Sequence, residues 1–272
     1  MRALPGTGPQ FSNGKICMSA KSLTYLLLLT ILLAAGCFNR RSEPAPDEST
    51  PSASPQEAEP ADSLTVSTEA AAAFAELNPV TVSEEEQWRT FRIVPAESKA
   101  AYIVDEELFA GAASKYGLEI GKTKVIGESQ DLDGLFQIDL SHPAIGPNRF
   151  AVFLPTLRTD HVLRDGWIRE NALESDRFPL AVFVASEVLE GPATYQEGEE
   201  TTFQLKGDLT LRGITLSTTW EVAARLDGST ISGTMQTRVR MTELGFDPPN
   251  FANTLTVNDE FTILIDFVAL EI

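Results

Sequence analysis

From Arg89 to the C-terminus, short runs of alternating apolar and polar residues are separated by Gly, Pro, Asn and Asp. Alternation with a period of two places successive side chains on opposite faces of a β-strand. The pattern predicts ten strands, over Thr90–Val94, Ala100–Val104, Thr123–Gln130, Gly134–Leu140, Arg149–Leu154, Leu180–Leu189, Thr201–Leu211, Leu216–Leu226, Thr230–Thr242 and Glu260–Glu271. Turn residues such as Asp227-Gly228 bound several of them. The segment therefore reads as an antiparallel all-β domain.

Most of these strands carry apolar side chains on one face only. Apolar faces are formed by Trp220, Val222, Ala224 and Leu226, by Met235, Val239 and Met241, by Phe203 and Leu205, and by Phe136, Ile138 and Leu140. The last strand has Phe261, Ile263, Ile265 and Phe267 on one face and Leu264, Val268 and Leu270 on the other, so we expect both of its faces to be covered.

Residues 156–173 interrupt the strand pattern. Val162, Leu163, Trp167 and Ile168 recur at nearly helical spacing, and Thr159 or Asp160 is a candidate N-cap, which predicts a short helix across a barrel end or flank. Pro179 ends any helix before the next strand. No helix is long enough to cover an open sheet, so we predict a closed antiparallel barrel, with a β-sandwich as the alternative.

The N-terminal segment has the composition of an export signal. Lys15 and Lys21 precede an apolar run of about 13 residues, Leu23–Ala35, which is shorter than the roughly 20 that span a bilayer. The run ends in Leu33-Ala34-Ala35-Gly36-Cys37, which resembles the lipobox cut by bacterial lipoprotein signal peptidase. We expect residues 1–36 to be removed and Cys37 to be lipidated, with translation starting at Met1 or Met18. An ordinary secretory peptide or a signal anchor is the alternative.

Residues 37–87 are predicted to be a disordered tether. Residues 39–73 are mostly Pro, Ser, Glu and Ala without sustained apolar periodicity, and residues 70–77 have the composition for at most a turn or two of helix. A random coil of this length spans about 40 Å. It would hold a barrel over residues 88–272 at the outer face of the cytoplasmic membrane, or at an outer membrane, which the absence of Asp after Cys37 favours.

The net charge of the chain limits the classes of partner that it can bind. The chain has a net charge of −18, and removal of residues 1–36 takes away three basic residues and no acid, which leaves −21. This balance disfavours nucleic acid and disfavours adsorption of the domain to anionic lipid. Cys37 is the one cysteine after residue 36, so the predicted exported chain has no internal disulfide and depends on its apolar core for stability.

The sequence contains no recognisable catalytic set. His142 and His161 are the two histidines, and surface or capping roles suit them better than metal ligation, because a zinc site needs three or four ligands. Gly-x-Ser-x-Gly and phosphate-loop motifs are absent. Asp131 with Asp133, and Glu174 with Asp176, are interpreted as solvated carboxylates. We therefore expect neither an enzyme nor a cofactor.

The order of several motifs resembles the YceI-like family. They are Gly134–Asp139, Leu157-Arg158-Thr159-Asp160 followed by Arg164-Asp165, Phe178–Phe183, Gly207–Thr215, Leu244-Gly245-Phe246, and the final apolar strand. The resemblance covers residues 91–272 and implies a lipocalin-like barrel whose apolar lumen binds a polyisoprenoid or another long-chain amphiphile. Where many members have a histidine-serine pair near the first long strand, this chain has Val94–Ser98 without histidine, so a ligand role for that histidine is not carried over.

Strand parity and the resemblance together give the candidate lumen. Its predicted residues are Phe136, Ile138, Phe150, Phe183, Phe203, Trp220, Val222, Val239, Phe261 and Ile263. Arg158 and Arg164 are candidates for contacting a headgroup at the mouth, although a local Asp–Arg ion pair that fixes the helix needs no ligand. Residues 109–116 are a candidate mouth loop.

Two functions follow as hypotheses. In the first, an anchored barrel carries or stores a polyisoprenoid, quinone or fatty-acid-like lipid. In the second, a filled barrel presents loops such as residues 105–122 to another envelope protein.

Overall fold

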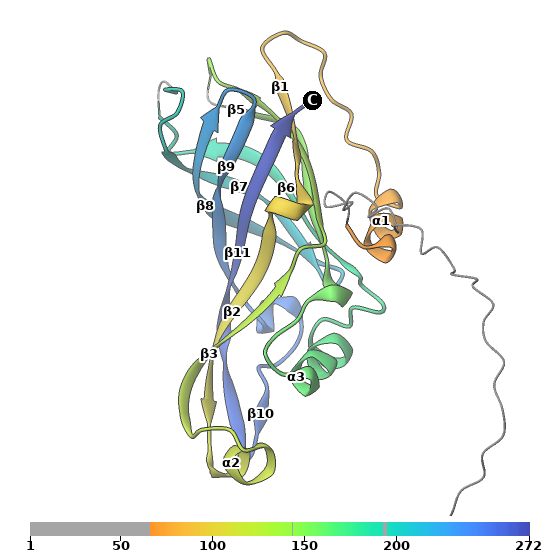
Figure 1. Ribbon diagram of the computed structural model, residues 1–272, viewed down its shortest axis with the longest axis vertical. Coiled ribbons are helices and arrows are strands. Elements are labelled where there is room, and N and C mark those ends of the chain that lie inside the picture. Colours follow the sequence, from red (N-terminus) through yellow and green to blue (C-terminus); the bar gives the residue numbers. More distant parts are fainter. Residues whose placement is uncertain (1–65, 143, 193–194) are drawn as a thin grey trace, which may run out of the picture. The chain divides into compact units, whose positions relative to one another are not determined.

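The computed structural model describes residues 66–142, 144–192 and 195–272. The predicted signal segment, Cys37 and residues 38–65 of the predicted tether lie outside the described residues. Figure 1 shows that strands dominate, with a few short helices. None of the described helices is both long and apolar enough to cross a bilayer.

The described elements alternate long strands with short helical turns. The strands are β1 (Arg89–Ile93), β2 (Lys99–Leu108), β3 (Gly121–Ser129), β4 (Leu132–Asp139), β5 (Ala144–Phe153), β6 (Leu180–Leu189), β7 (Thr201–Leu211), β8 (Ile214–Asp227), β9 (Thr230–Arg240), β10 (Asn250–Phe251) and β11 (Leu255–Glu271). The helices are α1 (Thr68–Ala75), α2 (Ala110–Tyr116) and α3 (Val162–Trp167), with 3-10 turns η1 (Pro95–Glu97), η2 (Leu154–Thr156) and η4 (Thr242–Leu244), and a π-helical turn η3 (Ile168–Ala172).

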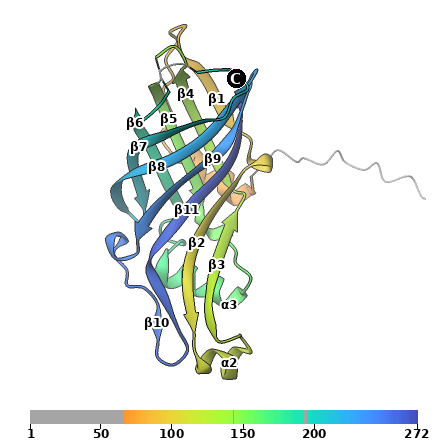
Figure 2. The ribbon, with the colours of Figure 1, turned by 90° about the vertical axis from the view of Figure 1, so that its left-hand side faces the viewer.

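Eight antiparallel strands form a closed ring, which confirms the predicted barrel. The order is β1-β4-β5-β6-β7-β8-β9-β11, and pairing of β1 with β11 closes it. Beyond η1, β2 also pairs with β11, and β3 pairs with β2. Figure 2 shows β2 and β3 running beside β11 toward α2. The barrel wall is therefore extended at this end by a second pair of strands.

The wall breaks where β1 gives way to β2. Ile93 is opposite Ala269 and Lys99 is opposite Asp266. The five residues 94–98 between β1 and β2 therefore lie opposite only two residues of β11, 267 and 268. Ser98 closes the irregularity, because its buried hydroxyl accepts a hydrogen bond from the Val268 N–H at 3.0 Å.

A second break separates β3 from β4 and creates the opening that positions the site. β4 pairs with β5, whereas among the described residues the backbone of β3 bridges to the segment after β5 only at Glu128, which exchanges two hydrogen bonds with Arg158. Residues 154–172, which form η2, α3 and η3, lie at this place. The helical segment therefore covers the gap in the wall beside the ends of β5, β7 and β9.

Five aromatic rings fill the middle of the barrel. Phe91, Phe136, Phe150, Phe183 and Trp220 follow one another with ring centroids 5.7, 5.4, 6.2 and 5.0 Å apart. All five side chains are buried, and Trp220 is only 1% exposed. Each comes from the inward parity of its strand, which confirms the predicted apolar faces.

Helix α1 corrects part of the predicted tether. Ser67 caps it, and the Ser67 N–H and hydroxyl donate to the Asp131 carboxylate at 2.6 and 2.8 Å. Ala70 and Phe74 are buried against the outward residues Ala151 and Phe153 of β5. Residues 66–77 thus fold on the barrel, because an apolar patch on the outside of β5 and β6 is available to cover the helix face.

Several predicted boundaries were also wrong. β2 and β3 continue as paired strands through residues 105–108 and 121–124, so the exposed connection is residues 109–120, which contain α2. The short strand β10 was missed, because its hairpin with β11 is only two residues long.

The cap of α3 is His161, without a side-chain cap bond, rather than Thr159 or Asp160. The outer face of β11 is only partly covered, and Leu270 is 44% exposed.

Candidate functional site

A cavity of about 450 Å³ lies where α3 and η3 cross the gap in the wall. Its lining comes from the inward faces of β2, β3, β5, β6, β7 and β11, from α3 and η3, and from residues 241–251. Most of the lining is apolar, including Val104, Trp167, Met241, Phe246 and Phe261. The volume falls within the roughly 300–1,000 Å³ of typical small-molecule sites.

The cavity reaches the protein surface beside α3. Leu163 and Phe251 line it and are 62% and 43% exposed. The Trp167 and Phe251 rings pack edge to face with centroids 5.7 Å apart, which links the helix to β10. Exposed apolar side chains at a cavity opening are typical of a binding site for an apolar ligand.

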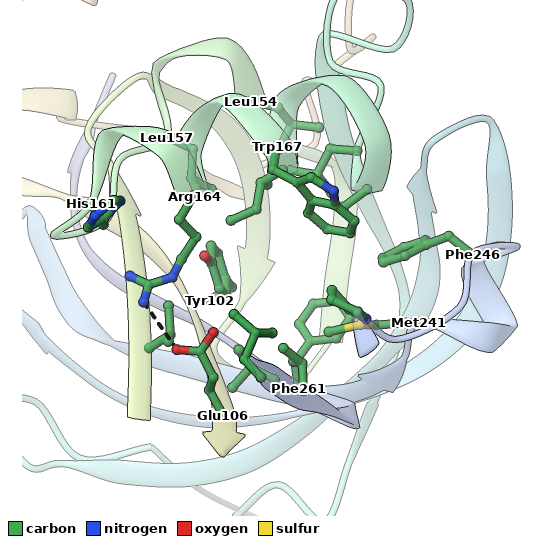
Figure 3. Close-up of a pocket in the computed structure, with 18 of the residues that line it drawn as sticks. Tyr102, Glu106, Leu154, Leu157, His161, Arg164, Trp167, Met241, Phe246 and Phe261 are labelled. Atoms are coloured by element: carbon green, nitrogen blue, oxygen red, sulfur yellow. Dashed lines mark hydrogen bonds and ion pairs between the residues drawn. The ribbon is translucent and has the colours of Figure 1, made fainter. Parts of the chain in front are cut away.

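Polar side chains gather at one side of the cavity, as Figure 3 shows. Glu106 of β2 and Arg164 of α3 form an ion pair at 3.1 Å, and the Glu106 side chain is only 3% exposed. Tyr102 lies beside Arg164, and His161 is on the same side. Trp167, Met241, Phe246 and Phe261 lie on the other side, so the cavity has a polar edge and an apolar body.

Carboxylates surround the Arg164 guanidinium. Asp160, one helical turn earlier, pairs with it in addition to Glu106. Asp165 is buried and accepts hydrogen bonds from the Thr159 N–H at 2.8 Å and from its hydroxyl at 2.6 Å. Arg164 is thus shared between two carboxylates, and Asp165 fixes the start of α3.

The Tyr102 hydroxyl has no hydrogen-bond partner within the described residues, although it is buried. Burial raises the pKa of Tyr102 well above its usual value, so the hydroxyl stays protonated and remains a donor. An unpaired buried donor costs free energy, and such groups in folded proteins call for an explanation.

A smaller cavity of about 140 Å³ lies on the other side of the aromatic row. It is lined by residues that include Ile138, Phe203, Val222 and Phe267. Its lining shares no residue with that of the larger cavity, because the row from Phe91 to Trp220 fills the interior between them.

The ten predicted lumen residues all belong to the inward core, but they divide into three groups. Phe261 and Ile263 line the larger cavity. Phe136, Ile138, Phe150, Phe203 and Val222 line the smaller one. Phe183, Trp220 and Val239 line neither and are packed core. Parity identifies the inward face but does not show where along a strand the core is incomplete; contact of these residues with a ligand stays a prediction.

Of the two arginines predicted to contact a headgroup, only Arg164 lines one of the two cavities described above. Arg158 is exposed, lies outside both cavities and donates to the Pro155 and Leu157 carbonyls at 2.8 Å. Arg164 lines the larger cavity, and its ion pairs are with Asp160 and Glu106 rather than with the neighbouring Asp165.

Several of the other titratable residues that the sequence analysis named have structural partners. His142 is exposed and packs on Asp139, whereas Asp131 holds Ser67. Asp133 pairs with Arg92 and Arg149, and Glu174 pairs with Arg177 and Arg212. The described part of the chain contains no cluster of three or more His, Cys, Asp or Glu that is suited to a metal ion.

Sequence reasoning missed the polar edge of the cavity. Tyr102 and Glu106 have the inward parity of Ala100 and Val104, but Tyr102 was not assigned to the lumen and the predicted strand ended at Val104, before Glu106. The signal in the sequence is an acidic residue, Glu106, at the inward parity of an apolar strand, because a charged side chain is rarely placed on such a face without a partner. Its partner Arg164 is 58 residues away, so only the folded chain brings the two together.

Known proteins match this architecture. Solved structures with the same fold include BcnA of Burkholderia cenocepacia, which has a TM-score of 0.50 and 16% identity over 65% of this chain and 98% of that chain. A polyisoprenoid-binding domain from Saccharophagus degradans, implicated in plant cell wall breakdown, has a TM-score of 0.48 and 13% identity over 67% of this chain and 98% of that chain.

Two curated proteins are similar to part of this chain in sequence. A UPF0312 protein of Photorhabdus laumondii is 31% identical over 97 residues, which are 35% of this chain and 46% of the relative. One from Enterobacter sp. strain 638 is 31% identical over 103 residues, 38% of this chain and 50% of the relative. The match spans about half the length of these curated relatives. The family model described as the YceI-like domain matches residues 91–269, which is most of the chain, and the chain therefore belongs to the YceI-like family.

Proposed function

We propose that this protein binds a long-chain amphiphile, such as a polyisoprenoid, a quinone or a fatty-acid-like lipid, for carriage or storage. The observation that carries the proposal is the 450 Å³ cavity with an apolar body, one polar edge and an opening beside α3. Membership of the YceI-like family supports it. Burying a tail contributes about 0.8 kcal/mol per methylene before ordering costs, so a long apolar tail alone gives useful affinity.

A binding role fits the site better than catalysis. The ionisable groups of the lining are few, and Glu106 and Arg164 neutralise each other. Paired catalytic groups need environments that separate their pKa values and a substrate position between them. The proposed role is therefore non-enzymatic. A cavity of this size also favours lipid binding over a filled barrel that acts only as an interaction module.

We further propose that Cys37 carries lipid and holds the barrel at the cell envelope. The support is the sequence Leu33–Cys37 and the short apolar run before it. Metabolic labelling with a fatty acid should mark the wild-type protein and leave the Cys37→Ser variant unlabelled and released from the membrane fraction. Labelling of the Cys37→Ser variant would disprove the anchor and leave the cavity proposal intact.

The cavity proposal is tested by filling the cavity. Ala181 of β6 lines it, whereas Val184 on the same strand faces outward and is exposed. We expect Ala181→Phe to lower affinity for a long-chain isoprenoid alcohol more than tenfold, roughly 1.4 kcal/mol or more, by occupying the space of the ligand. Val184→Phe adds the same ring outside the barrel and should bind like the wild type.

Native mass spectrometry of the full chain in non-ionic detergent reads the adduct directly. Thermal unfolding of both variants establishes that each is folded. Equal loading of the wild type and a folded Ala181→Phe variant would disprove this cavity as the binding site.

A further inference from the structure

We propose that the cavity selects lipids whose polar end is uncharged, such as an alcohol or a quinone, and rejects phosphate, diphosphate and carboxylate ends. The selecting groups are Tyr102, Glu106 and Arg164. This inference rests on the proposed function, because it concerns the polar end of the ligand bound in the same cavity.

The guanidinium that an anionic headgroup would need is already occupied. Glu106 holds Arg164 at 3.1 Å, and Asp160 holds it from the solvent side. Arg164 itself is 19% exposed, whereas Glu106 is almost fully buried. A phosphate that took Arg164 away would leave the Glu106 carboxylate buried and unpaired, which is far more costly than breaking a surface pair.

The local charge also opposes an anion. Around Tyr102, three carboxylates, those of Glu106, Asp160 and Asp165, act against the single guanidinium of Arg164. Lys115, the other basic residue of the lining, is exposed on α2, and His161 lies at the edge. Charges act over longer distances in a weakly solvated cavity than in water, so the carboxylates disfavour a doubly charged headgroup.

The Tyr102 hydroxyl supplies what an uncharged oxygen requires. It is a buried donor without an acceptor within the described part of the chain. The opposite residue of β3 is Gly127, and a Cβ built there would lie 2.2 Å from the Tyr102 ring, so the missing side chain lets the ring lie against β3. A ligand carbonyl or hydroxyl oxygen that reached this donor would satisfy it without disturbing the Glu106–Arg164 pair.

Two ligands with the same tail test the inference. The full chain in non-ionic detergent is offered an equimolar mixture of geranylgeraniol and geranylgeranyl diphosphate, and native mass spectrometry compares the two adducts. We expect the alcohol adduct to exceed the diphosphate adduct at least tenfold, about 1.4 kcal/mol. Equal or preferred binding of the diphosphate would overturn the inference and leave the proposed function standing. If neither compound binds, the proposed function itself fails.

Variants of Glu106 and Tyr102 test whether these residues cause the preference for the alcohol over the diphosphate. Glu106→Gln keeps the shape but removes the buried carboxylate partner of Arg164, and should lower the alcohol-to-diphosphate ratio at least fivefold. Tyr102→Phe should weaken alcohol binding about threefold to tenfold through loss of one hydrogen bond. Val184→Phe, outside the barrel, should leave the ratio unchanged. If both cavity variants fold and keep the wild-type alcohol-to-diphosphate ratio and affinity, these residues do not select the ligand. If Glu106→Gln does not fold, the Tyr102→Phe affinity and the wild-type ratio still test the inference.

Discussion

At the scale of single residues, the two tyrosines of the barrel interior have contrasting surroundings. Tyr195 donates to the Leu226 carbonyl at 2.5 Å, whereas the buried Tyr102 hydroxyl has no partner within the described residues. Both rings are partly buried against the core. The difference indicates that Tyr102 is not optimised for stability of the unliganded fold and is available for another role.

The contrast predicts opposite effects of removing each hydroxyl. Tyr102→Phe should leave the free energy of unfolding unchanged or raise it by up to about 1 kcal/mol, since no hydrogen bond is lost and an unpaired group disappears. Tyr195→Phe should lower it by about 1 kcal/mol and leave the Leu226 carbonyl short of a donor. Urea unfolding of the ligand-free protein measures both; a loss above about 1 kcal/mol for Tyr102→Phe would show that its hydroxyl is satisfied.

Residue identity alone does not reveal such a site. The apolar body of the cavity is visible in strand parity, because Phe261 and Ile263 share one face of the last strand with Ile265 and Phe267. The polar edge joins residues from β2 and α3 that are distant in the sequence, so the charge on Arg164 suggested a headgroup contact when its partner Glu106 was unknown. Ion pairing depends on the folded geometry and changes the interpretation of each charge.

At the scale of elements, the strands were largely predictable, because each must bury one face in the barrel interior. The observed β6 and β7 have the predicted boundaries, whereas β2 and β8 are longer because backbone pairing continues past the apolar pattern. For helix α1, the sequence allowed a turn or two at residues 70–77, but the docking of this helix on the barrel was not predicted. Its stability depends on an outward patch of β5 and β6 that no local pattern reveals.

The packing of α1 gives a prediction for that element. Phe74→Asp should detach the helix, since burial of a phenyl ring contributes about 2 kcal/mol. Hydrogen exchange should lose about 30-fold protection at the α1 amides and little at β7 and β8. Ala72→Asp, which adds the same charge at an exposed position of the helix, is the matched control. Retained protection in the Phe74→Asp variant would contradict docking through this ring.

The seam between β1 and β11 gives a pH prediction. Arg89 and Glu271 form a two-point pair at 2.8 and 2.6 Å, and the hydrogen bond from Arg89 holds the pKa of Glu271 below its usual 4.5. A carboxyl whose pKa is lower in the folded state stabilises the fold above its unfolded pKa, and this contribution is lost as pH falls through the folded pKa. The pair should therefore stabilise the seam at neutral pH and contribute nothing in strong acid.

Glu271→Gln should cost up to about 1 kcal/mol at pH 7, because both side chains are about one-third exposed. The difference from wild type should disappear well below pH 4.5. Urea unfolding at pH 7 and at the lowest pH at which the fold persists gives both values. Glu119→Gln, whose carboxylate makes no ion pair within the described residues, controls for net charge. A cost for Glu271→Gln that grows in acid would contradict the assignment.

At the scale of the whole molecule, one closed sheet combines a packed middle with a cavity at the break in its wall. The aromatic row from Phe91 to Trp220 supplies the rigid core, and the departure of β3 from β5 leaves space that α3 only partly fills. Stability and ligand space are thus assigned to different parts of one interior. Substituting Trp220 would test folding, whereas substituting Ala181 tests binding.

The most direct test of lipid binding is a crystal structure of the full protein isolated from its own envelope, combined with organic extraction of the same sample. We predict continuous elongated density in the cavity between Trp167 and Phe261, with its polar end at Tyr102, and a stoichiometric long-chain species in the extract. A cavity closed by its own side chains, together with an extract free of lipid, would contradict the account.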